Sequence, residues 1–113
     1  MKRVISVQIH PNRIPKVSVE NLIAQFYMIT KNSKEVRAIK IEVNLTRPKY
    51  INVNYKTNDT KKTWRAIQEK VLNVKRVGAL IKAGSIIMCE GRKSWKDYLL
   101  LHHYDVKQKV DEL

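Results

Sequence analysis

Residues 39–55, with the sequence IKIEVNLTRPKYINVNY, decide the fold of this 113-residue chain. Apolar and polar side chains alternate on both sides of the short connection Thr46–Lys49, and a period of two is typical of strands with one buried face. Two such runs joined by a few residues predict an antiparallel hairpin. The polar face of this hairpin is expected to carry Lys40, Glu42, Asn44, Tyr50, Asn52 and Asn54.

Upstream of the hairpin, the sequence predicts one strand and one helix. Strict alternation from Ile5 to Ile9 predicts the strand, and the prolines at positions 11 and 15 end it. Apolar residues then recur at three- and four-residue spacing, which predicts an amphipathic helix over roughly 18–31 with Ser18 as its N-cap.

Downstream, a second helix is expected after the cap at Asn58–Thr60. Gly78 weakens its continuation, so we expect a break near Asn73–Gly78 and then a short helix that ends at Gly84. The apolar stripe of the second helix is Trp64, Ile67, Val71 and Val74.

Two strands, Ser85–Glu90 and Tyr98–Tyr104, complete the chain and are joined by the loop Gly91–Asp97. The order β-α-β-β-α-β-β predicts an α+β fold. A small antiparallel sheet in the split β-α-β, or ferredoxin-like, arrangement with helices on one face accounts for this order most simply. A winged-helix-like C-terminal half is the alternative. The length predicts one domain over residues 1–113, with 105–113 a frayed tail.

Charge is the strongest functional signal. There are 23 Lys and Arg against 10 Asp and Glu, a formal net charge of +13. This excess repels itself in a folded protein, and binding to a polyanion such as nucleic acid offsets that repulsion. The chain is 43% hydrophobic, which predicts a folded domain rather than a disordered basic tail. It has neither an apolar signal segment nor a membrane-spanning run, so we expect a soluble, intracellular (cytoplasmic) protein with no membrane partner.

Three surfaces are candidates for nucleic-acid binding. The polar sheet face offers amide groups for base edges and a tyrosine for stacking, the second helix offers cations for phosphate, and the Gly91–Asp97 loop offers cations with an aromatic side chain. The candidate residues are Lys40, Tyr50 and Asn52 on the sheet, Lys61, Lys62 and Arg65 on the helix, and Arg92, Lys93, Trp95 and Lys96 in the loop. The aromatic and glycine-containing strands of the RNA-recognition motif are missing, so only the topology is predicted.

The sequence predicts no catalytic, metal or cofactor site. His102 and His103 are neighbours on a strand and face opposite ways, and the lone Cys89 excludes an intrachain disulfide and is expected to be buried. A metal-dependent nuclease would have to use Glu42, Glu90, Asp97 or Asp105, and the aspartate that a carboxylate-then-lysine nuclease strand needs upstream is missing. We therefore expect a protein without enzymatic activity.

These observations predict a small basic protein that binds RNA or single-stranded DNA by phosphate contacts and base stacking. One alternative is a winged-helix regulator of double-stranded DNA, although its recognition helix near Arg76–Ala83 would be short and mostly apolar. The other is an accessory or inhibitor protein that binds an acidic or nucleic-acid-binding protein partner. The polar sheet face could equally form a homodimer.

Overall fold

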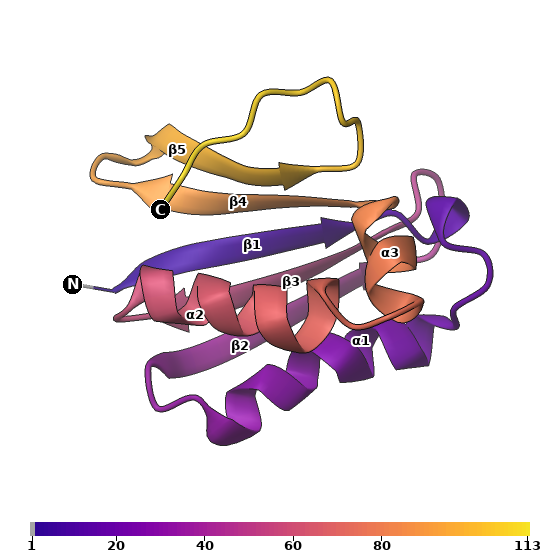
Figure 1. Ribbon diagram of the computed structural model, residues 1–113, viewed down its shortest axis with the longest axis horizontal. Coiled ribbons are helices and arrows are strands. Elements are labelled where there is room, and N and C mark those ends of the chain that lie inside the picture. The colour runs from indigo at the N-terminus through magenta and orange to yellow at the C-terminus, as the bar shows by residue number, and fades with distance from the viewer. Residues whose placement is uncertain (1) are drawn as a thin grey trace.

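The computed structural model of the protein describes residues 2–113, apart from the side chain of residue 32. It contains one five-stranded antiparallel sheet in the order β2-β3-β1-β4-β5 (Figure 1). The strands are β1 (Arg3–Ile9), β2 (Val36–Asn44), β3 (Tyr50–Thr57), β4 (Ser85–Gly91) and β5 (Ser94–His103). The helices are α1 (Val19–Tyr27), α2 (Thr60–Ile67) and α3 (Val77–Lys82).

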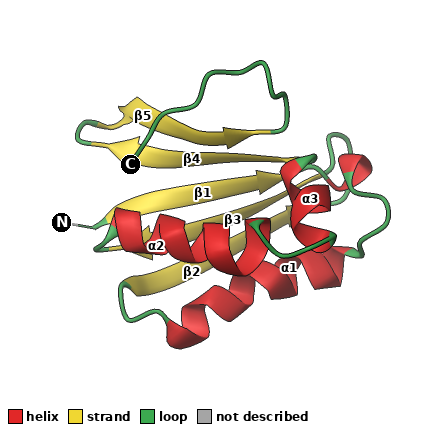
Figure 2. Cartoon of the chain, viewed as in Figure 1, coloured by secondary structure: helices red, strands yellow, loops and turns green. Residues whose placement is uncertain are grey.

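This architecture confirms the predicted α+β fold. α1 links β1 to β2, and the segment that contains α2 and α3 links β3 to β4. In the sheet, β1 lies at the centre between β3 and β4. This is the split β-α-β arrangement with β5 added beside β4. All the helices lie on one face of the sheet (Figure 2).

The hydrophobic core lies between that face and the helices. Ile5, Val7 and Ile9 of the central strand are completely buried, as their alternation predicts. Leu22 and Phe26 of α1 are buried against the sheet at the four-residue spacing of one helix face.

Both predicted N-caps are confirmed. Ser18 accepts a hydrogen bond from the Asn21 N–H (3.2 Å) at the start of α1, and Asp59 accepts one from the Lys62 N–H (3.0 Å) at the start of α2. These side chains satisfy main-chain groups that the first turn of a helix leaves unpaired. The first helix is shorter than expected, because α1 ends at Tyr27 and continues only as a 3-10 turn, Met28–Asn32.

The predicted break after the second helix is present, but it has an unexpected geometry. α2 runs into a π-helical turn, Gln68–Leu72, and α3 begins after it. A side chain at Gly78 would collide with the main-chain oxygen of Leu72, so a glycine is required where α3 packs against this turn. The extra residue of the π turn rotates the chain beyond it, so Val71 is buried whereas Val74, predicted to lie on the same stripe, is 39% exposed.

The winged-helix alternative for the C-terminal half is wrong. Ile5 of β1 lies opposite Cys89, so the 85–104 hairpin is part of the main sheet and does not form a separate wing. α3, the helix that would read a groove, has only six residues and buries Gly78 and Ile81.

The predicted loop Gly91–Asp97 is also wrong in its extent, because β5 already begins at Ser94. Gly91 pairs with Ser94, whose φ of 64° allows a tight turn, while Cys89 pairs with Leu99. The additional residues on the β5 side form a bulge, so Trp95 belongs to the distorted start of a strand.

The two edge strands of the sheet, β2 and β5, have environments that the alternation of apolar and polar residues does not predict. At one edge, Val43 and Leu45 are 46% and 55% exposed although they continue the apolar alternation of β2. At the other edge, the Asp111 N–H donates to the Leu100 carbonyl (2.7 Å) and the Leu100 N–H donates to the Asp111 carboxylate (2.8 Å). The C-terminal segment therefore covers part of β5 (Figure 1), and its fraying stays a prediction.

None of the helices within residues 2–113 has the length and hydrophobicity needed to cross a bilayer.

Candidate functional site

One end of the sheet collects cations from segments that are distant in the sequence. Arg3 at the start of β1 lies opposite Thr57 at the end of β3, just before α2. On its other side β1 pairs with β4, which leads into the turn at Arg92 and Lys93. The start of α2 and this turn therefore flank Arg3, and β2 also begins here, because Val36 pairs with Thr57.

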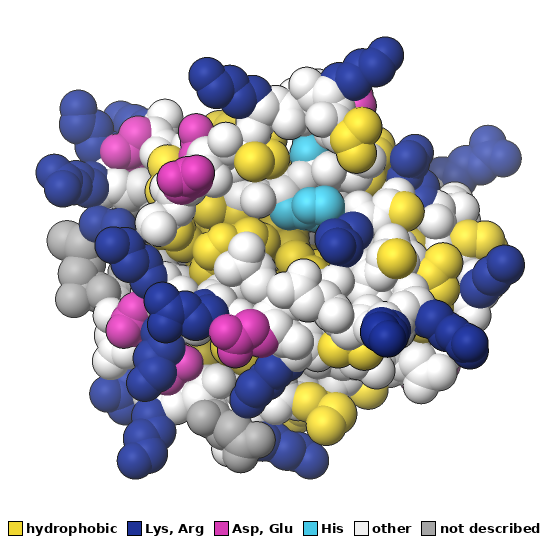
Figure 3. All heavy atoms as spheres, viewed as in Figure 1, with side chains coloured by type: hydrophobic (Ala, Val, Ile, Leu, Met, Phe, Trp, Pro, Cys, Tyr) yellow, Lys and Arg dark blue, Asp and Glu magenta, His cyan; other side chains and the backbone are white. Residues whose placement is uncertain are grey.

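We call this surface the basic end. It appears as a dense group of Lys and Arg side chains along the left edge of Figure 3, where the N-terminus lies in Figure 1. Its residues are Arg3, Lys34, Arg37, Lys56, Lys61, Lys62, Arg92, Lys93 and Lys96. Two of the three surfaces predicted from the sequence, the helix and the loop, thus form one surface, and Arg65 continues it one turn further along α2.

Two carboxylates at the basic end, those of Glu90 and Asp97, bind main-chain groups. Glu90 accepts hydrogen bonds from the Val4 N–H (2.8 Å) and the Ser94 hydroxyl (2.9 Å), and so ties the turn to the central strand. Asp97 accepts one from the Lys93 N–H (2.8 Å), inside the turn. Asp59, the N-cap of α2, also accepts a hydrogen bond from the main chain. Since these acidic side chains bind main-chain groups, the Lys and Arg charges of this end remain available to an external anion.

Trp95 lies beside these cations. It is 42% exposed, so part of its ring is accessible for the stacking proposed from the sequence. A side chain at Gly91 would collide with Asp97, so the glycine permits the close approach of the two strands from which Trp95 projects. Aromatic surface next to lysine is the combination that stacks on a base while the cation contacts phosphate.

The open face of the sheet, opposite the helices, carries the third predicted surface. Asn52 lies between Gln8 and Glu42 on the neighbouring strands, and Lys40 lies opposite Asn54. Tyr50 is half-buried at the far end of β3, away from the basic end. The structure thus separates Lys40, Tyr50 and Asn52 from the other predicted residues.

This face is less polar than the sequence suggests. In the register of the sheet, Ile86 and Met88 of β4 lie opposite Gln8 and Ser6, so they share the open face with them. The polar part is confined to β1, β2 and β3, and an apolar strip lies next to it on β4.

An aromatic cluster at the far end of the sheet was not found from the sequence. The Tyr104 ring contacts His10 edge to face (centroids 5.6 Å apart) and His103 at a tilt (4.5 Å), and the Arg13 guanidinium lies 3.9 Å from its centroid. Since Ile9 pairs with Ile51, Tyr50 at the start of β3 lies at this same end of the sheet. The residues come from both ends of the chain, so only the pairing of β4 with β1 could have revealed the cluster.

Burial and charge both act on the ionisable groups near this cluster. Burial, with Arg13 and His103 nearby, lowers the pKa of His10. Burial also lowers the pKa of His102. The hydrogen bond that its Nε2–H donates to the Lys82 carbonyl (2.8 Å) opposes this lowering, while the charges of Lys82 and His103 add to it. No group of three or more His, Cys, Asp or Glu within residues 2–113 is arranged to hold a metal ion.

Two buried groups in the core are chemically inert. Cys89 is completely buried, as predicted, and burial raises the pKa of its thiol to about 11. The Tyr55 hydroxyl donates to the Phe26 carbonyl, and burial raises the pKa of this tyrosine as well. Neither group offers a nucleophile at neutral pH.

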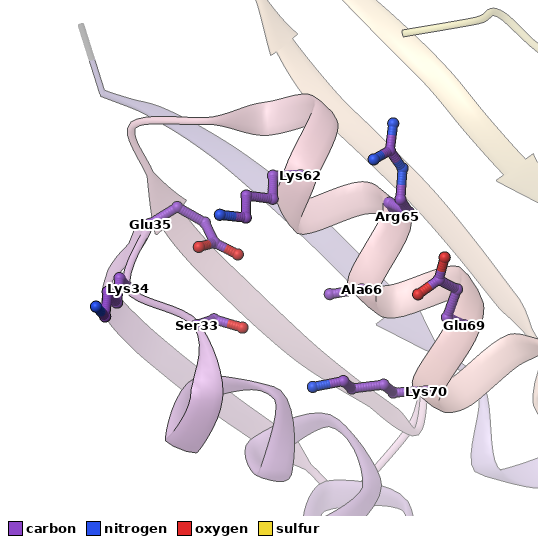
Figure 4. A pocket seen from close by; sticks show the side chains of 8 residues that line it. All are labelled: Ser33, Lys34, Glu35, Lys62, Arg65, Ala66, Glu69 and Lys70. Atoms are coloured by element: carbon purple, nitrogen blue, oxygen red, sulfur yellow. The ribbon is translucent and has the colours of Figure 1, made fainter.

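Two cavities adjoin the basic end. The smaller, about 270 Å³, is lined by Arg3 and residues 58–61. The larger, about 430 Å³, lies between α2 and residues 33–35 (Figure 4). Its walls carry both signs of charge, since Glu35 and Glu69 line it together with lysines. We call it the Glu35 pocket.

Comparisons of the chain with protein-family models, curated proteins and solved structures found no match.

Proposed function

We propose that this protein binds single-stranded nucleic acid, RNA or DNA, through its basic end. One observation carries the proposal: the topology gathers cations from five segments at one end, while Glu90 and Asp97 there are bonded to main-chain N–H groups. A surface of this kind binds phosphates with no need for base-specific contacts.

Base stacking supports a single strand over a duplex. Trp95 at the basic end and Tyr50 on the open face are both accessible, and the cluster of His10, His103 and Tyr104 lies at the same end of the sheet as Tyr50. Unpaired bases expose the faces that such rings stack on, whereas a duplex hides them. The short, buried α3 gives the protein no helix suited to a major groove.

The test is a titration against single-stranded RNA, single-stranded DNA and duplex DNA at low and moderate salt. We expect single strands to bind more tightly than the duplex, with an affinity that falls steeply as salt rises, because binding releases counterions from phosphate. The double variant K61E/K93E, with one charge reversal in α2 and one in the turn, is expected to weaken binding at least tenfold at low salt.

The matched control is K107E/K109E, which makes the same change of net charge in the C-terminal segment, outside the set of residues that defines the basic end. If both double variants lose affinity equally, only net charge matters and the basic end is not the site. If the wild type binds none of the three nucleic acids at low salt, the proposal is wrong, and a protein partner with an acidic surface becomes the leading alternative.

A further inference from the structure

The Glu35 pocket contains a carboxylate that the fold does not require. Glu35 is only 8% exposed. Its main chain does the structural work, because its carbonyl accepts hydrogen bonds from the Asn58 N–H (3.1 Å) and the Thr57 hydroxyl (3.1 Å). The carboxylate itself points into the cavity (Figure 4). Its oxygens face the open cavity, where a ligand that brings hydrogen-bond donors can reach them.

The other side chains at the cavity define what that ligand must present. Lys62 of α2 and Lys70 of the π turn extend into it, on either side of the small side chain of Ala66 (Figure 4). The partly buried Ala66 gives the wall an apolar patch between the two charges. Glu69 and Arg65 also line the cavity, but their charged groups point away from the Glu35 side (Figure 4).

Such a site matches a planar group that carries two adjacent N–H donors next to an acceptor. Guanine has this pattern on its Watson–Crick edge, where N1–H and the N2 amino group lie beside O6, and unpaired bases are commonly recognised through that edge. The two oxygens of Glu35 can accept from N1–H and N2–H, and an ammonium such as that of Lys62 can donate to O6. The volume of about 430 Å³ lies within the range of small-ligand pockets.

We propose that the Glu35 pocket receives one unpaired guanine of the bound strand, with Glu35 as the base-reading residue and Lys70 placed to contact phosphate. This inference rests on the proposed single-strand binding and adds a base preference to it. The position of the pocket supports it, because Lys34 and Lys62 belong both to the basic end and to the pocket lining.

The experiment compares two short RNA oligonucleotides, a uridine heptamer with guanosine at its centre and the same heptamer with inosine there. Inosine differs from guanosine only by the missing N2 amino group. We expect the wild type to prefer the guanosine oligonucleotide about tenfold, as a bidentate contact to a base provides. E35Q is expected to bring the affinity ratio of the two oligonucleotides close to one.

E69Q is the matched control, since it removes the same charge from the same pocket without changing the side chain that points inward. It is expected to keep the preference of the wild type, and circular dichroism reports whether each variant is folded. Equal binding of the two oligonucleotides by the wild type would overturn the guanine pocket and leave single-strand binding intact, as would a preference that survives in E35Q. Failure of the wild type to bind either oligonucleotide at low salt would overturn both proposals.

Discussion

At the scale of single residues, two histidines make the fold sensitive to acid. His10 Nε2–H donates to the Gln8 side-chain oxygen (3.0 Å), and His102 Nε2–H donates to the Lys82 carbonyl. For both, the pKa in the folded protein is lowered from the ordinary 6.5, mainly by burial. The folded state therefore disfavours the imidazolium. The nearby charges of Arg13 and Lys82 add to this effect, whereas the hydrogen bond from His102 to the Lys82 carbonyl partly opposes it.

The lowered pKa values make the protein less stable in acid. Below pH 6.5 the unfolded chain takes up protons that the folded protein resists, so the free energy of unfolding is expected to fall as the pH drops from about 7.5 to about 5.5. Urea unfolding at these two pH values measures the change. The variant H10Q/H102Q should make the free energy of unfolding depend less on pH. The control H103Q keeps His10 and His102, so it should retain most of the pH dependence. A wild-type protein that is equally stable at both pH values would contradict the prediction.

At the scale of elements, the π turn after α2 decides which valine belongs to the core. Val71→Ala is expected to lower the free energy of unfolding by about 2 kcal/mol, because it removes buried methyl groups and leaves a cavity. Val74→Ala is expected to change it by less than about 0.5 kcal/mol, since that side chain is exposed. Urea unfolding of the two variants side by side tests this. Equal losses would mean that the helical stripe continues unbroken to residue 74.

The contrast between Val71 and Val74 shows which features of the helices and strands the sequence can predict and which it cannot. Alternation predicted the central strands because each position in a strand has a fixed side, and the caps at Ser18 and Asp59 marked helix starts for a local chemical reason. The π turn and the bulge before Leu99 each insert residues whose effect depends on tertiary contacts, such as the close approach at Gly78 and Gly91. A periodic pattern carries no signal for either.

In the candidate site, too, some residues could be predicted from the local sequence and others only from the fold. Lys61, Lys62, Arg92 and Lys93 were predicted from local runs of charge, and the fold brings them together. Arg3 and Glu35 gave no such signal, because one is a single cation at the chain start and the other a single carboxylate. Their importance depends on strand order and burial, which only the structure supplies.

At the scale of the whole molecule, the aromatic side chains that can stack on bases lie at opposite ends of the sheet. Tyr50 begins β3, whose 8 residues end at the basic end, roughly 25 Å away along the strand. Trp95 lies at that end too, in β5, with β1 and β4 between the two strands. The whole domain measures only 37 × 31 × 28 Å. A nucleic-acid strand that contacts both aromatic residues must therefore cross most of the open face. Such a path suits the site sizes of about 4–16 nucleotides that single-strand-binding domains cover.

This geometry predicts that the length of the oligonucleotide decides which aromatic residue matters. For a strand of about 12 nucleotides, Trp95→Ala and Tyr50→Ala should each weaken binding by about 1–3 kcal/mol, the value of one stacked base. For a strand of about 4 nucleotides held by the basic end, only Trp95→Ala should do so, because the strand is too short to reach Tyr50. Fluorescence anisotropy gives the affinities, and thermal unfolding should show little change in either variant, since neither ring is fully buried. If Tyr50→Ala lowers the affinity for the short oligonucleotide as much as that for the long one, the prediction is wrong. The short nucleic acid would then bind on the open face and not at the basic end.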